Sequence, residues 1–135
     1  MFVQQSTNSF DMKKVNLVLQ ILLAFLLLFS GLNKFFGFLP MQPMPGPAGE
    51  FATALAATGY MMKMVAVVEV LVGALLLLNK FVALSLIMLV PITVNIVAFH
   101  LFLDLQGIWG GAFVAVANVY MLIVYRASYK GMFKS

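Results

Sequence analysis

The chain has no cysteine and a single histidine, and these two shortages restrict its chemistry. Without cysteine, the 135 residues can form no disulfide, no thiol relay and no cysteine-ligated zinc or iron–sulfur cluster. A site with several histidine ligands is also excluded within one copy, because His100 has no second histidine to join it. We therefore predict that the protein holds no metal site.

Charged residues are scarce as well. They make up 9% of the chain, whereas soluble domains contain about 25%. Hydrophobic residues reach 64% and the mean hydropathy is +1.08, which is more apolar surface than a soluble domain of this size can bury. Disordered chains are poor in apolar residues, so disorder is excluded too. The sequence indicates one membrane domain over residues 1–135, with the lipid bilayer as its surroundings.

Long apolar runs predict an all-α membrane protein, a bundle of four transmembrane helices. About 20 residues cross the hydrocarbon core of a bilayer. The expected spans are residues 15–37, 60–79, 81–101 and 107–126. The first span follows Lys13 and Lys14, as in a signal peptide, but it is too long and lacks a cleavage motif, so we expect a permanent helix.

An outer loop over residues 39–59 separates the first two spans. Its prolines and glycines predict an extended segment followed by a short helix from Ala48 to Thr58, with Pro47 at its start. Phe51 and Leu55 share one face of that helix. We expect the helix to lie on the outer, periplasmic membrane surface or to close the mouth of the bundle.

Basic residues set the expected orientation, because loops rich in lysine and arginine stay in the cytoplasm. With the N-terminus inside, the inner side holds Lys13, Lys14, Lys80, Arg126, Lys130 and Lys134. The outer side keeps Lys34 and Lys63. Both termini are therefore predicted to be cytoplasmic. The net charge of +4 reflects this topology, and we predict no binding to nucleic acid.

Polar side chains within the spans are the candidate functional residues, because polarity is costly inside a bilayer. Most of them fall in the outer half, whereas Gln20 is isolated toward the inner side. Glu69 lies near the middle of the second span, where Lys34 or Lys63 can reach it in a structural ion pair or a proton-handling site. We predict Glu69 and His100 as catalytic residues. The candidate ligand-binding residues are Lys34, Asn33, Asn95, Asn118 and Trp109.

Three of these residues have a structural interpretation beside the functional one. His100 either bonds Asp104 one turn later or, oriented by Asp104, gives a proton to a ligand. Pro91 leaves a helix carbonyl unpaired, which predicts a pocket beside Asn95 or a plain kink. Asn118 contacts either a neighbouring helix or a ligand. It lies on the same helix face as three small residues at a spacing of four, which allow helices to approach closely. This ladder of small residues comprises Gly107, Gly111 and Ala115.

Three segments together carry a pattern known from one membrane-protein family. They are Ser30-Gly31-Leu32-Asn33-Lys34-Phe35, then Met64–Leu78 with Glu69 and Gly73, and Pro91-x-x-x-Asn95-x-x-x-x-His100. This pattern, over about residues 15–125, resembles the DoxX-like (DoxX/DoxD) family. The resemblance implies a four-helix bundle in the bacterial inner membrane. It also implies association with redox complexes, one of which is a thiosulfate:quinone oxidoreductase.

Three functions remain open at this point. A quinone-binding subunit of a redox complex uses Glu69 as proton carrier, and Lys34, Asn95 and His100 as hydrogen-bond donors. Its electrons must pass through a partner or a bound cofactor, because the chain has no cysteine. A non-catalytic scaffold instead uses its polar groups as interhelical pairs and supports membrane or periplasmic subunits, or a second copy. Transport is disfavoured, since four helices leave little room for alternating access.

Overall fold

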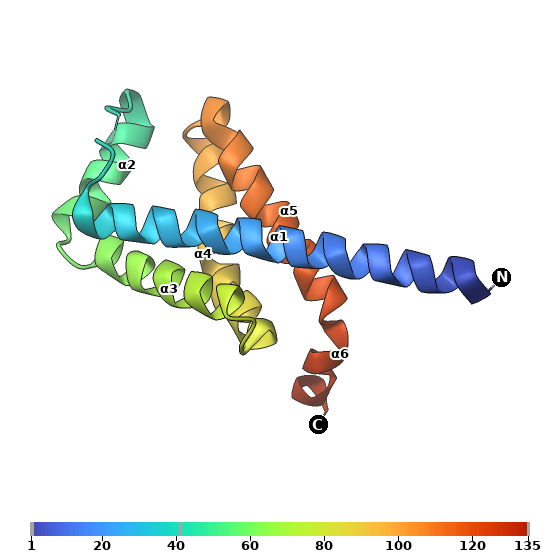
Figure 1. The fold of residues 1–135 in the computed structure, drawn as a ribbon. Coiled ribbons are helices and arrows are strands. Elements are labelled where there is room, and N and C mark those ends of the chain that lie inside the picture. Colours follow the sequence, from blue (N-terminus) through green and yellow to red (C-terminus); the bar gives the residue numbers. More distant parts are fainter. Residues whose placement is uncertain (1, 41, 135) are drawn as a thin grey trace.

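The computed structural model describes residues 2–40 and 42–134, and every regular element in these ranges is a helix (Figure 1). The elements are α1 (Phe2–Phe36), α2 (Gly46–Ala57), α3 (Met61–Leu77), α4 (Val82–Phe102), η1 (Leu105–Gly107), α5 (Ile108–Val124), α6 (Arg126–Tyr129) and η2 (Lys130–Phe133). The all-helical expectation is confirmed. The last two elements are short turns that continue the direction of the chain beyond α5.

Among the described residues, three helical segments are each long and apolar enough to cross a membrane. They are Asp11–Phe36 within α1, Val82–Phe102, and Leu105–Val124. A fourth span is obtained only if α2 and α3 count together, and these two helices are bent by 88° at the break between them. The chain is therefore an all-α protein with three, or at most four, helices of membrane-spanning length.

The helix boundaries follow the sequence closely at most positions. Three helices, α3, α4 and α5, begin and end within a few residues of the predicted spans. The short helix begins at Gly46, two residues before the expected Ala48, with Pro47 in its first turn. The largest difference is at the N-terminus, where α1 begins at Phe2 and not near residue 15.

Two helix pairs make up the molecule. In Figure 1, α1 and α3 run side by side, and α4 and α5 run together across them. Glycines allow the first pair to approach closely. A Cβ atom on Gly31 would lie 2.8 Å from Val70, and one on Gly73 would lie 2.8 Å from Leu28. No larger side chain fits at either position without moving a helix.

The core lies where the two pairs meet. Its largest fully buried apolar side chains are Leu23, Leu27, Val72, Leu76, Leu86, Leu89 and Met121. Gln20 is buried beside them and is not isolated, contrary to the sequence interpretation. Its Nε2 donates to the Leu76 carbonyl at 2.8 Å and to the Asn79 Oδ1 at 3.0 Å. The Gln20 side chain thus links α1 to the end of α3 by hydrogen bonds.

The connection between α3 and α4 is a tight turn, as the sequence predicted. The backbone N–H of Asn79 donates to Leu76, and that of Lys80 donates to Leu75, which closes the end of α3. Asn79 adopts a left-handed conformation with φ of 54°, which asparagine tolerates better than most residues. The carbonyl groups of Ala74, Leu75 and Leu76 in the last turn of α3 are therefore bonded within the protein.

Candidate functional site

An ion pair joins α1 to α3. Lys34 Nζ lies 2.7 Å from Glu69 Oε2, and it donates a second hydrogen bond of 2.7 Å to Ser30 Oγ. The Ser30 hydroxyl lies 3.4 Å from both Glu69 oxygens. The Glu69 side chain is 4% exposed and that of Lys34 is 20% exposed. The carboxylate is thus buried, and its lysine partner reaches a more open region.

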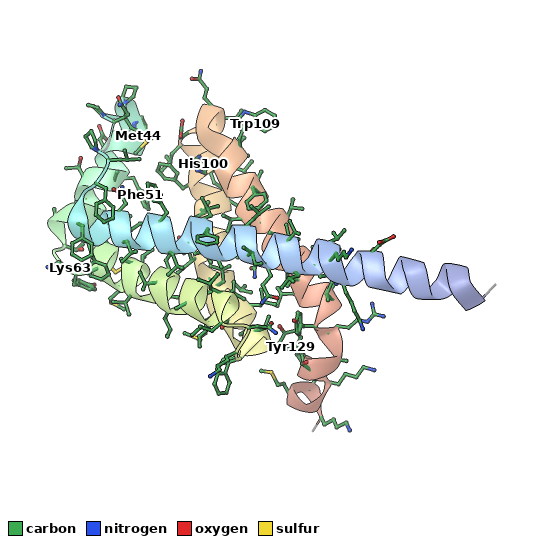
Figure 2. All side chains as sticks on the ribbon, viewed as in Figure 1. Met44, Phe51, Lys63, His100, Trp109 and Tyr129 are labelled. Carbon is green, nitrogen blue, oxygen red and sulfur yellow. The ribbon has the colours of Figure 1, made fainter. Side chains whose placement is uncertain are left out.

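The sequence left the partner of Glu69 open between Lys34 and Lys63, and the structure pairs it with Lys34. Lys63 is exposed near the start of α3, and its side chain points away from the helices (Figure 2). The same-face spacing of Ser30 and Lys34 explains the outcome, since residues four apart on a helix lie one above the other. Both residues therefore face α3 together.

A cavity of about 380 Å³ lies between α2, α3 and α4. It is within the size range of small-molecule sites, about 300–1,000 Å³. Its walls are apolar apart from three side chains: Lys34, Asn95 and His100. Phe51 of α2 lines it and contacts Phe99 of α4, with ring centroids 5.6 Å apart. The short helix α2 thus forms one wall of the cavity through Phe51, and Met44, just before α2, also lines it (Figure 2).

A second cavity, of about 310 Å³, lies between α1, α3, α4 and α5. Ser30, Lys34 and Glu69 line it on one side and His100 on another. Lys34 and His100 also line the first cavity, as do three apolar side chains: Val65, Ile92 and Ile96. The ion pair and the histidine therefore stand where the two cavities adjoin.

His100 is held at the end of α4 by the turn that follows it. Its Nδ1 atom lies 3.1 Å from the Asp104 carbonyl oxygen and 3.4 Å from Asp104 Oδ2. The expected contact with Asp104 is therefore present. The other edge of the ring lies against Gly111, where a Cβ atom would come within 2.8 Å of Cδ2 and 3.5 Å of Nε2. The absence of a side chain on Gly111 leaves room for the imidazole.

The two asparagines named from the sequence lie in different surroundings. Asn95 lines the larger cavity beside Pro91, and its Nδ2 donates to the Pro91 carbonyl at 3.1 Å. Asn118 is buried outside both cavity walls. Its Nδ2 donates to the Leu86 carbonyl at 3.0 Å, and its Oδ1 accepts from Thr93 at 3.1 Å. These contacts support the interhelical interpretation of Asn118.

Asn33 and Trp109 do not line either cavity. Asn33 Oδ1 accepts a 2.8 Å hydrogen bond from the backbone N–H of Leu39, which fixes the chain as it leaves α1. Trp109 is 82% exposed and points away from the cavities (Figure 2). The structure thus brings together Lys34, Glu69, Asn95 and His100 of the candidate residues, and it leaves Asn33, Asn118 and Trp109 apart.

Two contributors to this region were absent from the set predicted from sequence. Ser30 bridges the ion pair, and Phe51 forms a cavity wall. The spacing of Ser30 and Lys34 was a usable signal for the first. The position of Phe51 depends on the bend between α2 and α3, for which the sequence offers only Gly59 and its neighbours.

The comparisons with known proteins give no assignment for this chain. No family model matches it, and neither a curated protein nor a solved structure is significantly similar to it.

Proposed function

We propose that the chain is a quinone-binding subunit of a redox-linked membrane complex, with the quinone in the cavity between α2, α3 and α4. The observation that carries the proposal is the composition of that cavity, which is apolar except for Lys34, Asn95 and His100. A quinone needs an apolar slot for its ring and tail, and a few polar groups at its carbonyl oxygens. Lys34 is a donor that faces this space.

Glu69 is the proposed proton carrier. It lines the adjoining cavity and is linked to Lys34 and Ser30 by the contacts described above. A proton released or taken up at the quinone then has a carboxylate one side chain away. Electrons must come from a partner subunit or a cofactor that the partner holds, because the chain has no cysteine.

The proposed setting is a bacterial inner membrane, and the family is the DoxX-like one that the motifs resemble. In this arrangement α1, α4 and α5 are spans, and α3, with 17 residues at the short end of the spanning range, is the fourth. Helix α2 is a short helix on the periplasmic side, and both termini are cytoplasmic. The distribution of lysine and arginine supports this orientation. The partners are membrane or periplasmic subunits, or a second copy of the chain.

The decisive experiment is organic extraction of the protein purified in mild detergent, followed by mass spectrometry. Stoichiometric quinone, or uptake of added short-chain quinone, is the expected result. A sample that contains only bulk phospholipid and takes up no quinone on titration would contradict the proposal.

A scaffold function is the second candidate, and one observation favours it. Within the described residues, every buried side-chain nitrogen or oxygen atom has a hydrogen-bond partner in the protein. Glu69→Gln separates the two candidates, because it removes the charge with little change of shape. A quinone subunit keeps its assembly and loses redox coupling, whereas a scaffold loses assembly with its partner.

A further inference from the structure

The hydrogen bonds of His100 indicate which of its ring nitrogens carries the proton. The two groups next to Nδ1 are the Asp104 carbonyl oxygen at 3.1 Å and Asp104 Oδ2 at 3.4 Å. A carbonyl oxygen and a carboxylate oxygen accept hydrogen bonds, so Nδ1 is the N–H donor. In the neutral ring, Nε2 then carries a lone pair and is an acceptor.

Nε2 is the atom left over for a ligand. No hydrogen bond within residues 2–40 and 42–134 involves it, and the ring lines both cavities. Gly111 beside this edge has no side chain, and a Cβ atom there would lie 3.5 Å from Nε2. The chain thus leaves an unpartnered acceptor in the wall of the larger cavity, which is apolar apart from Lys34 and Asn95.

Lys34 provides the complementary donor. Its ammonium group has three N–H bonds, of which one points to Glu69 Oε2 and one to Ser30 Oγ. The third has no acceptor in the described part of the chain, and Lys34 lines the same two cavities. A donor and an acceptor therefore face the same space.

We propose that this site selects a head group with a hydroxyl, so that the reduced form, the quinol, binds more tightly than the quinone. This inference rests on the proposed function. A hydroxyl accepts from Lys34 Nζ and donates to His100 Nε2, which satisfies both groups. A carbonyl oxygen accepts from Lys34 but has no hydrogen for Nε2, which is then left buried without a partner.

The expected preference follows from one additional hydrogen bond between neutral groups. Such a bond favours the quinol by about three- to tenfold in Kd. The preference is to be measured under anaerobic conditions that keep the quinol reduced.

The experiment titrates the purified full-length protein with a short-chain benzoquinol and with the matching benzoquinone, and heats of binding give both Kd values. His100→Asn is the informative variant, because its amide can still donate to Asp104 but presents no acceptor at the position of Nε2. The ratio of the two Kd values is expected to fall to about one. Leu101→Ala is the matched control, since this exposed neighbour on α4 lines neither cavity, and its ratio should stay at the wild-type value.

The possible outcomes separate the two proposals. If neither form binds, the quinone-binding function fails, and this inference fails with it. If both forms bind and the quinone binds equally well or better, the preference is refuted and the function stands. The wild-type ratio decides this even if His100→Asn does not fold. If the quinol preference persists in His100→Asn, another residue causes the preference, and the role of Nε2 is overturned.

Discussion

The two halves of the molecule use polar side chains in opposite ways. In the half farther from α2, Gln20 and Asn118 are buried, and each donates to a backbone carbonyl of another helix. In the half next to α2, Lys34, Asn95 and His100 line cavities, and His100 keeps one ring nitrogen without a partner among the described residues. The first half is packed to hold helices together, whereas the second has room and spare hydrogen-bonding capacity. Glu69 belongs to both descriptions, since it is buried and paired yet lines a cavity.

The strongest test of this contrast is Lys34→Met, which leaves the Glu69 carboxylate buried without its cation. We expect a loss of about 3 kcal/mol in the free energy of unfolding, at the low end for broken buried pairs because the Lys34 side chain is 20% exposed. Reversible unfolding in mixed micelles, followed by circular dichroism, measures it. Lys63→Met is the control and should change little, since Lys63 is exposed. A loss below about 1 kcal/mol would show that the ion pair is dispensable for folding.

The two glycines between α1 and α3 give the next largest effect. Gly73→Ala places a Cβ atom 2.8 Å from Leu28 and 3.0 Å from the Ala24 carbonyl, so the helices must separate slightly. Overpacking of this kind costs about 1–3 kcal/mol in the free energy of unfolding. Gly110→Ala is the matched control on α5, where the added atom meets open space. It should be neutral or stabilising, and a destabilised Gly110→Ala would mean that this face of α5 is covered.

Asn118 and Asn95 test the two halves directly. Asn118→Leu leaves the Thr93 hydroxyl and the Leu86 carbonyl without their partner and should cost about 1–3 kcal/mol of stability. Asn95→Leu should change stability less, because Asn95 is exposed and, among the described residues, its side chain bonds only its own helix at Pro91. Under the proposed function, Asn95→Leu weakens quinone binding, whereas Asn118→Leu does not. The reverse pattern in thermal unfolding and quinone titration would overturn this division.

The smallest effect concerns the C-terminal turn. Tyr129 in α6 donates to the Ala83 carbonyl at 2.9 Å, and burial, followed by the nearby Tyr125, raises the pKa of the Tyr129 phenol above 10.0. A raised pKa in the folded state means that the contribution to stability is complete below about pH 10. It is lost as the pH rises through the folded-state pKa. Unfolding measured from pH 8 to 11 should show this loss in the wild type and a weaker dependence in Tyr129→Phe.

The sequence predicted the helices well because apolar runs and prolines are local signals. It also predicted that a pocket could lie beside Pro91 and Asn95, and a cavity is present there. The face predicted for α5 was right at Gly111 and Asn118 and wrong at Gly107 and Ala115. Of the ladder Gly107, Gly111 and Ala115, Gly111 alone is buried, and the face comprises Gly111, Val114, Ala117, Asn118 and Met121.

The missed features depend on how helices are placed relative to one another. The partner of Gln20 lies at the end of α3, more than 50 residues away in the chain, and no periodicity of α1 points to it. The sequence left α2 open between the membrane surface and the mouth of the bundle, and its position over the cavity depends on an 88° bend. By contrast, the Lys34–Glu69 pair was foreseeable, because two cations were near one carboxylate and same-face spacing favoured one of them.

In the proposed arrangement, where α3 is a membrane span, the bond from Gln20 to the end of α3 has a consequence for the surrounding lipid. Helix α3 has 17 residues and is about 26 Å long, shorter than a hydrocarbon core of about 30 Å. A span shorter than the core is accommodated by local thinning of the bilayer, by snorkelling of flanking side chains or by oligomerisation. Carbonyl groups that end within the core need partners from the protein. Here the Leu75 carbonyl accepts from the N–H of Lys80, and the Leu76 carbonyl accepts from both Gln20 and the N–H of Asn79. This end of α3 can therefore lie below the membrane interface without leaving those carbonyl groups unpaired.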